Sequence, residues 1–320
     1  MMAQIDNVVA GIDVAKDKVD ACLRSIAERP VLPSTTEGRR RLIAWLRQHN
    51  VAKAVMEASG GYEKEWAKAL RKAGIEVWVV DPKRVRNFAL SAGRMAKNDK
   101  IDADTIAWFA ETFKEGPSQI HDADQEELQG LVKARLGLVE MRARLCQSGH
   151  GATGLAQKAN ARILKQLDGE IAKFEAAICA KVKSTPELAE RAEIIASVPG
   201  LGEVSAANLV AGMPELGRVS GKVAAALIGV APYDDDSGKR RGDRHVKAGR
   251  RWVRNAIYMP CVGAATLNNS ILKAYYQRLI ARGKEPKVAI VACMRKLIVI
   301  LNTMLTRRQK WDPRRAIVVS

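Results

Sequence analysis

The sequence predicts an N-terminal α/β domain, a long helical segment and a mostly α-helical C-terminal domain. In residues 7–115, short apolar runs alternate with helical patterns, which is typical of a sheet covered by helices. In residues 122–185 apolar side chains repeat at heptad spacing, with no strand signal. Residues 190–306 have helical patterns punctuated by proline and glycine. We therefore expect three domains, at residues 1–118, 119–188 and 189–320.

The first domain is expected to open with a hairpin and a helix. Val8–Val14 is a short apolar run, and Lys18–Leu23 follows after a turn, which predicts two paired strands. Glu37–His49 has its leucines and isoleucine on one stripe, which predicts an amphipathic helix.

Two further strands and two further helices complete this domain. Val51–Ala58 is a second apolar strand, and Tyr62–Ala73 is a helix with apolar residues on one face. Ile75–Val80 is a third core strand, which ends at the turn Asp81-Pro82. Asp99–Phe113 is expected to be a helix.

The middle segment carries two apolar seams of 3-4 spacing, separated by the glycine-rich break Ser148–Gly154. This pattern predicts two long helices. It fits an antiparallel pair within one chain and a dimerising coiled coil equally well. The first seam is Leu131, Ala134, Leu138, Met141 and Leu145, and the second is Leu164, Leu167, Ile171, Phe174 and Ile178.

The C-terminal domain is punctuated by Thr185-Pro186 and Pro199-Gly200, and Pro286 precedes its long last helix. Val288–Leu305 is the most apolar stretch of the chain. Because Arg295 and its neighbour Lys296 interrupt it, we expect a buried helix rather than a membrane span.

Cysteines and histidines give no sign of a metal site or of a disulfide framework. The five cysteines are scattered without a CxxC pair, and the four histidines are isolated. The N-terminus has acidic residues where a signal peptide needs a basic start. These observations indicate a protein of the reducing cytoplasm.

The charge of the chain is strongly asymmetric. Its 53 Lys and Arg against 35 Asp and Glu give a net charge of +18. Residues 237–320 hold 20 of these basic residues and 3 acidic ones, while residues 1–236 are almost neutral. A basic block of this kind attracts a polyanion, and nucleic acid is the leading candidate. The alternatives are a solvated basic face or a tail near acidic lipid.

Four carboxylates in the first domain are candidate metal ligands. Asp13 and Glu57 lie near the ends of two predicted strands, and Asp99 and Asp102 share one face of a predicted helix. The carboxyl edge of such a sheet is the usual place for an α/β active site. Oxygen ligands without His or Cys suit Mg²⁺ or Mn²⁺, which can act in phosphoryl transfer. Taken singly, each acid is also explained as a helix cap or a surface charge.

A glycine turn opens the C-terminal domain. Pro199–Val210 reads PGLGEVSAANLV, in which Gly200 and Gly202 precede an alanine-rich helix. Backbone N–H groups at such a helix start can approach a phosphate, as in a helix-hairpin-helix DNA-backbone binder. A plain tight turn is the competing interpretation.

A basic loop follows three consecutive aspartates, Asp234 to Asp236. Ser237 stands beside Gly238 at its start, and cations around it would stabilise a phosphorane-like state, so this serine is a candidate nucleophile. A turn residue is the simpler interpretation, and Tyr233, Tyr258, Tyr275 and Tyr276 are rival nucleophiles. The basic residues expected to bind phosphate are Lys239, Arg240, Arg241, Arg244, Lys247, Arg250, Arg251 and Arg254.

Five motifs in order give the chain a family resemblance. They are GIDVAKDKVDACL, VMEASGGYE, KNDKIDA, PGLGEVSA and GVAP followed by SGK and GRRWVR. Together they resemble the DEDD transposases of bacterial insertion sequences, insertion-sequence family one-hundred-and-ten, which are also described as bridge-RNA-guided serine recombinases. The resemblance covers residues 7–305.

The resemblance implies a RuvC-like, RNase H-type N-terminal domain, a coiled-coil connection and a C-terminal transposase domain. It implies that Asp13, Glu57, Asp99 and Asp102 hold Mg²⁺. It also implies that Ser237 attacks a DNA phosphate and forms a transient 5′-phosphoserine link.

The implied partners are donor and target DNA, a structured non-coding guide RNA, and further copies of the chain in a dimer or tetramer. In such an assembly the acids of one subunit would assist the serine of another. The implied location is the bacterial cytoplasm, at the nucleoid, without a membrane.

The same residues also fit two other functions. A metal-dependent RuvC-like junction nuclease would use the acids and leave Ser237 as a turn residue. A non-catalytic nucleic-acid-binding scaffold would use the helical middle for assembly, but it gives no reason for four acids to converge.

Overall fold

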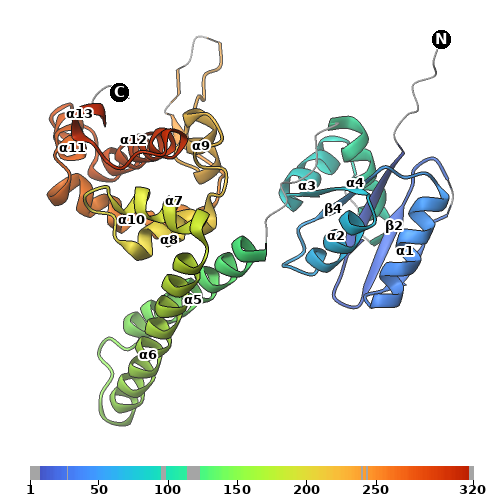
Figure 1. The fold of residues 1–320 in the computed structure, drawn as a ribbon, viewed down its shortest axis with the longest axis horizontal. Helices are drawn as coiled ribbons and strands as arrows, with labels where there is room; N and C mark the ends of the chain where they lie inside the picture. Colours follow the sequence, from blue (N-terminus) through green and yellow to red (C-terminus); the bar gives the residue numbers. More distant parts are fainter. Residues whose placement is uncertain are drawn as a thin grey trace. The chain divides into compact units, whose positions relative to one another are not determined.

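The computed structural model describes residues 8–26, 28–94, 99–113, 123–238, 241–242 and 244–316. The side chains of residues 99–101 and 315–316 lie outside this description. The chain forms two compact units, Met1–Ile120 and His121–Ser320. Figure 1 shows the sheet of the first unit and the helices of the second. A separate domain at residues 119–188 stays a prediction.

The first unit contains a five-stranded sheet in the order β3-β2-β1-β4-β5. Strand β1 pairs in parallel with β4, and β4 with β5, whereas β2 and β3 join by antiparallel pairing. This mixed sheet confirms the expected RNase H-type α/β domain. The strands are β1 (Val9–Val14), β2 (Lys18–Cys22), β3 (Val31–Pro33), β4 (Lys53–Glu57) and β5 (Glu76–Val80).

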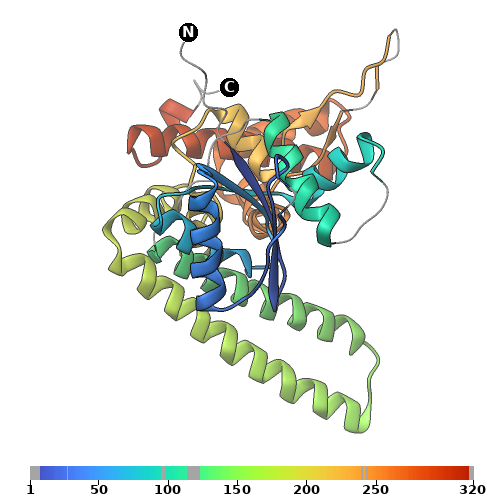
Figure 2. The same ribbon diagram turned by 90° about the vertical axis from the view of Figure 1, so that its right-hand side faces the viewer.

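Helices cover both faces of this sheet (Figures 1 and 2). On one face, alternate strand residues such as Ile12 pack with Leu42 of α1 (Thr36–Gln48) and Trp66 of α2 (Glu63–Lys72). The opposite face carries α3 and α4, which pack against Val55, Trp78 and Val80. This arrangement follows from the two-residue period of the strands.

Helix α3 (Pro82–Ser91) was not expected, because the sequence around it reads as a turn. Asp81 is its N-cap and accepts a hydrogen bond from the backbone N–H of Lys83 at 2.8 Å. Pro82 stands at the first helical position, where its missing N–H costs nothing. Helix α4 (Asp99–Phe113) has the bounds that its pattern predicts.

The second unit is helical apart from one short hairpin, among the residues described. Its first helices are α5 (Ala123–Ser148), α6 (Gly154–Ser184), α7 (Pro186–Ala196), α8 (Glu203–Gly212) and α9 (Gly221–Ile228). Strands β6 (Pro232–Tyr233) and β7 (His245–Val246) form the hairpin. The last helices are α10 (Arg251–Gly263), the π-helical turn η1 (Ala264–Asn268), α11 (Ser270–Ala281), α12 (Pro286–Arg307) and α13 (Pro313–Ala316).

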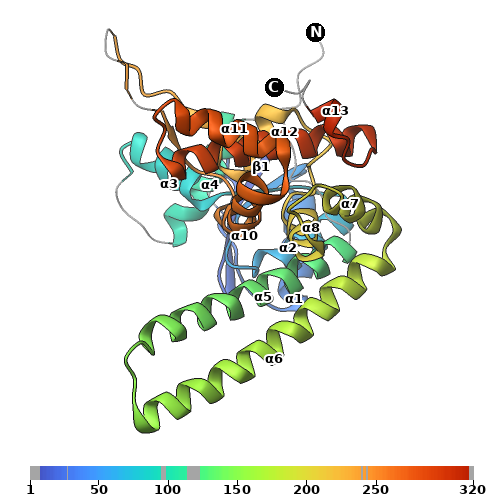
Figure 3. The ribbon, with the colours of Figure 1, turned by 90° about the vertical axis from the view of Figure 1, so that its left-hand side faces the viewer.

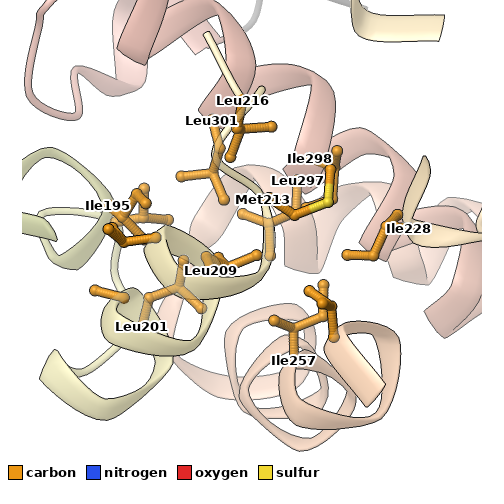
Figure 4. Packing of buried hydrophobic residues seen from close by; sticks show 14 of the residues in the cluster. Ile195, Leu201, Leu209, Met213, Leu216, Ile228, Ile257, Leu297, Ile298 and Leu301 are labelled. Carbon is orange, nitrogen blue, oxygen red and sulfur yellow. The ribbon is translucent and has the colours of Figure 1, made fainter. Parts of the chain in front are cut away.

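Helix α12 is the central helix of this unit. By length and composition it could cross a membrane, but 61% of its apolar window is buried inside the domain. Leu297, Ile298 and Leu301 pack there against Leu209 of α8 and Ile257 of α10 (Figure 4). The segment is therefore a buried helix, as Arg295 and Lys296 within it predict.

Helices α5 and α6 form an antiparallel pair within the chain (Figure 3). Two ion pairs of 2.5 Å fix the register, one between Arg135 and Glu175 and one between Arg142 and Asp168. At the base of the pair, Lys181 binds Asp124 at 2.8 Å. The buried residues of the pair near this base are Leu128, Val132, Ile178 and Val182, of which only Ile178 belongs to the predicted seams. No residue of the first predicted seam is fully buried. Association of the exposed seam with another chain stays a prediction.

Candidate active site

Asp13 and Glu57 lie side by side in the sheet. The parallel register pairs Ile12 with Met56, so the next residue on each strand is one of the two acids. Residues at one level of neighbouring parallel strands point to the same face. Both acids are half-buried, and both stand at the carboxyl ends of their strands. This is the convergence that the sequence predicts for these two residues.

Helix α4 crosses the face on which these acids lie. Gly11 of β1 shares that face with Asp13, and its lack of a side chain lets the helix approach. A Cβ at Gly11 would lie 2.2 Å from the carbonyl oxygen of Ala103 and 2.4 Å from the backbone nitrogen of Ala107. The glycine therefore sets the distance between α4 and the strand that carries Asp13.

The direction of α4 brings its first turn toward Asp13. Cys22 of β2 is paired with Gly11, so Arg24 stands level with the start of β1. The Arg24 guanidinium binds the Glu111 carboxylate near the end of α4 at 2.6 Å. The helix thus runs from the Asp13 end of β1 toward its beginning. Its first four residues include Asp99 and Asp102; Asp102 is half-buried, and the Asp99 side chain lies outside the described residues.

Asp104, two residues after Asp102 in α4, is held by cations at the β2 side of the helix. Arg94 binds its carboxylate at 2.5 Å, and Arg29 lies 3.5 Å away. The Cys22 thiol lies 3.8 Å from the same carboxylate. Burial, opposed by Arg29, raises the pKa of that thiol. Asp104 thus has a structural use in α4 packing.

The donor chemistry of the four predicted acids fits a hard divalent cation, because all are carboxylates. Among the side chains that the structure describes, no group of three His, Cys, Asp or Glu could hold a metal ion. The side chain of Asp99 lies outside the described residues. The metal-binding role of the four acids stays a prediction.

Ser237 lies in the exposed loop of the β6–β7 hairpin, which projects from the helical unit beside α9 (Figure 1). Asp234 and Arg244 on the two arms form an ion pair of 2.6 Å, so one of the three aspartates is neutralised. Lys239 and Arg240, both expected to bind phosphate, lie outside the described residues. Among the rival nucleophiles, Tyr233 is exposed, whereas the other three tyrosines pack against the core.

The hairpin is fixed firmly at its base. A Cβ at Gly249 would lie 2.2 Å from the backbone nitrogen of Gly229, so the two backbones touch there. Arg254 donates to the carbonyl oxygens of Gly229 at 2.9 Å and Ala248 at 3.3 Å. One nitrogen of the Arg254 guanidinium therefore joins the hairpin to α10.

Arg250 is also bound within its own domain. It forms a bidentate ion pair with Glu215 at 2.5 and 2.7 Å and donates to the Gly212 carbonyl oxygen at 2.9 Å. No motif singled out Glu215, and only its position just after α8 could have drawn attention to it. The remaining predicted cations, Arg241, Arg244, Lys247 and Arg251, are exposed.

Of the two glycines in the turn between α7 and α8, Gly200 is packed and Gly202 is exposed. Gly200 has a φ of +97°, and a Cβ there would lie 2.7 Å from the Ala264 side chain. Gly202 is exposed at the N-cap of α8, and nothing lies within 4 Å of a Cβ built on it. The backbone around Gly202 is therefore accessible to a phosphate.

Comparisons with known proteins assign both parts of the chain to one family. A family model of DEDD transposases of the IS110 type matches residues 10–152, and a model described as the transposase IS116/IS110/IS902 family matches residues 192–277. Together they cover most of the chain.

Relatives of similar length match nearly the whole chain. A pilin gene-inverting protein of Moraxella bovis is 26% identical over 95% of this chain and 97% of its own. The transposase for insertion sequence element IS1111A of Coxiella burnetii is 24% identical over 96% and 92%. Among solved structures, Thermus thermophilus RuvC is 18% identical and covers 35% of this chain and 99% of its own, with a TM-score of 0.28.

Proposed function

Because this chain belongs to the IS110 family of DEDD transposases, we propose that it cuts and rejoins DNA through a transient 5′-phosphoserine link at Ser237. A divalent metal held by Asp13, Glu57, Asp99 and Asp102 assists. The observation that carries this proposal is the register of β1 and β4, which sets Asp13 beside Glu57 on the face that α4 crosses.

The serine step exchanges one phosphodiester for another. The Ser237 hydroxyl attacks the DNA phosphorus, its Oγ–P bond forms as the P–O3′ bond breaks, and the proton ends on the departing 3′ oxygen. A 3′ hydroxyl of another strand then attacks the phosphoserine and releases Ser237 with its proton. The exposed cations of the hairpin, Arg241 and Lys247, bind the phosphate during both steps.

The carboxylates supply oxygen ligands for Mg²⁺ or Mn²⁺. The bound ion would act as a Lewis acid toward a phosphate oxygen. The residues of this chain hold the ligands in place: the strand register aligns Asp13 and Glu57, and Gly11 admits the α4 backbone above them.

The partners of the reaction follow from the family resemblance. Donor and target DNA are the substrates, and a structured guide RNA selects them by base pairing. The acids and the serine belong to different units of the chain. A dimer or tetramer that joins the acids of one subunit with the serine of another would complete the site. Such a complex would act in the bacterial cytoplasm, at the nucleoid.

A junction nuclease without a serine nucleophile is the second candidate. It is favoured by the acids at the carboxyl edge of an RNase H-type sheet and by Ser237 lying in a loop, where serine is common as a turn residue. In that reaction water replaces the serine, and no protein–DNA bond forms.

A covalent adduct separates the two candidates. Labelled donor DNA, incubated with guide RNA and Mg²⁺, is denatured and run on a protein gel. We expect wild type and Tyr233→Phe to give a labelled protein band, and Ser237→Ala to give none while still binding DNA. Asp13→Asn and Asp102→Asn should lose the band, because each removes a charged metal ligand.

The outcomes are distinct. DNA cleavage by Ser237→Ala without any adduct would support the nuclease. An adduct formed by Ser237→Ala would overturn the serine assignment, and full activity of Asp13→Asn would overturn the metal cluster.

A further inference from the structure

A groove of about 950 Å³ lies in the second unit, where the β6–β7 hairpin meets α9, α11 and α12. The hairpin lines it with Pro232, Arg244, His245 and Val246. The groove therefore adjoins the arms of the loop that carries Ser237. None of its helical residues belongs to the basic loop that the sequence singled out.

Part of the groove lining is cationic. Six Lys and Arg side chains line it, and its lining contains no Asp or Glu from the described part of the chain. Arg244 is paired with Asp234, which is not among the lining residues. The six are Lys222, Arg244, Arg278, Lys287, Arg295 and Lys296. A concave surface with this charge attracts a polyanion.

Apolar side chains make up another part of the groove lining. Val288 and Val246 are 54% and 37% exposed, which is high for valine, and Val291 and Val299 continue the surface along α12. Tyr275 adds an aromatic ring, with the Arg278 guanidinium 5.1 Å and the Lys296 ammonium 4.9 Å from its centroid. Exposed apolar surface of this kind marks a binding site more often than a solvated face.

A groove that combines apolar and cationic side chains distinguishes single-stranded from duplex nucleic acid. A duplex turns its phosphates outward and hides the faces of its bases, so a cationic surface alone suffices to bind it. Unpaired nucleotides also expose the faces of their bases, which bind apolar and aromatic side chains while cations follow the backbone. The valines and Tyr275 therefore fit unpaired bases better than a duplex.

The surroundings of Lys296 favour a bound anion. Its burial and the nearby Arg278 lower the pKa of its ammonium group. A phosphate between these two cations would relieve their mutual repulsion and replace lost hydration.

We propose that this groove binds single-stranded DNA next to the phosphate that Ser237 attacks. The inference rests on the proposed function, because that function makes DNA the strand presented to the hairpin. Phosphates would lie along Lys287, Arg295 and Lys296, and bases would lie against Val288 and Tyr275. The groove would hold nucleotides that are unpaired while the strand is cut.

The test measures binding of the full-length protein to fluorescent 20-nucleotide single-stranded DNA, the matching duplex and single-stranded RNA. We expect the double variant Lys287→Ala/Arg295→Ala to weaken single-stranded DNA binding by about tenfold or more. The matched control is Arg282→Ala/Lys284→Ala, whose exposed cations lie between α11 and α12 outside the groove. It should change affinity by less than about twofold.

The apolar part of the lining is tested separately by Val288→Ser, which removes apolar surface without removing charge. We expect about a fivefold loss for single-stranded DNA and little change for duplex. Leu267→Ser, at a residue 75% exposed and outside the groove, is the control. Oligonucleotides carrying 5-iodo-deoxyuridine should crosslink to the groove lining, with Tyr275 as the expected site.

Each result has a defined meaning. Equal losses for single strand and duplex in Val288→Ser would overturn the unpaired-base assignment, and a stronger effect on RNA than on DNA would assign the groove to the guide. Unchanged binding by the double variant would overturn the site. These readouts need no cleavage. Groove-dependent binding without a Ser237 adduct would therefore refute the proposed function alone, and an adduct with groove-independent binding would refute this inference alone.

Discussion

At the scale of single residues, cations that look alike in the sequence have different surroundings. Arg250 and Arg254 bind carbonyl oxygens of their own domain, whereas Arg241 and Lys247 in the same basic segment are exposed. In the sequence, a run of basic residues looks the same whether its guanidinium groups face solvent or bind a neighbouring carbonyl oxygen. The segment was therefore predictable, but the distribution of its members between structure and phosphate binding was not.

Glu215 is expected to stabilise the domain through Arg250. Its side chain is 11% exposed and that of Arg250 is 31% exposed, so Glu215→Gln leaves a shielded cation with less compensation. We expect the free energy of unfolding to fall by about 1–2 kcal/mol, measured by urea denaturation. The control is Glu187→Gln, which removes an ion pair with Arg218 whose side chains are both about 60% exposed. Its free energy of unfolding should fall by less than about 0.5 kcal/mol. Equal losses would contradict a structural role for Glu215.

At the scale of elements, the apolar strands and long helices were predictable because burial imposes their periods on the sequence. The short edge strand β3 has three residues and ends in Pro33, too little for a pattern. The register of β1 against β4 was not readable from sequence, although it decides that Asp13 meets Glu57. The groove was missed because its cations Lys222, Arg244 and Arg295 come from parts of the chain that are far apart in sequence.

The α7–α8 turn offers a matched pair of glycine variants. Gly200→Ala puts a Cβ against Ala264 at a φ of +97°, so we expect unfolding to become easier by about 2 kcal/mol or more. Gly202→Ala has open space and a φ of −91°, so stability should change by less than about 0.5 kcal/mol.

The two variants also separate packing from DNA contact. If the α8 N-terminus binds a phosphate, Gly202→Ala should weaken duplex binding in an anisotropy titration while thermal unfolding is unchanged. Unchanged affinity in Gly202→Ala would leave the turn with a packing role only.

At the scale of the whole molecule, the net charge of +18 is concentrated in the unit that carries the hairpin and the groove. The N-terminal 236 residues are nearly balanced, and their acids include the candidate metal ligands. This asymmetry was readable from composition alone. How the charge divides between a hairpin, a groove and intramolecular pairs depends on the fold.

Duplex binding should therefore depend steeply on salt. Each phosphate contact releases counterions, so Arg241→Ala/Lys247→Ala should reduce the slope of log K against log salt by about 1.8. Arg308→Ala/Lys310→Ala removes two cations that face Glu190 and Glu193, and its slope should match wild type. Titrations between about 50 and 200 mM salt measure both. Equal slopes in all three proteins would exclude the hairpin cations from the DNA contact.

The α5–α6 pair has a consequence for how this molecule can vary. Its two 2.5 Å ion pairs, Arg135–Glu175 and Arg142–Asp168, are separated by seven residues on each arm. One heptad can therefore be removed from or added to both arms together, and the seam stays in register. The base at Lys181 and Asp124 is untouched by such a change. The length of the α5–α6 pair can therefore change by insertion or deletion of whole heptads. The helices of the domain at its base are not altered by such a change.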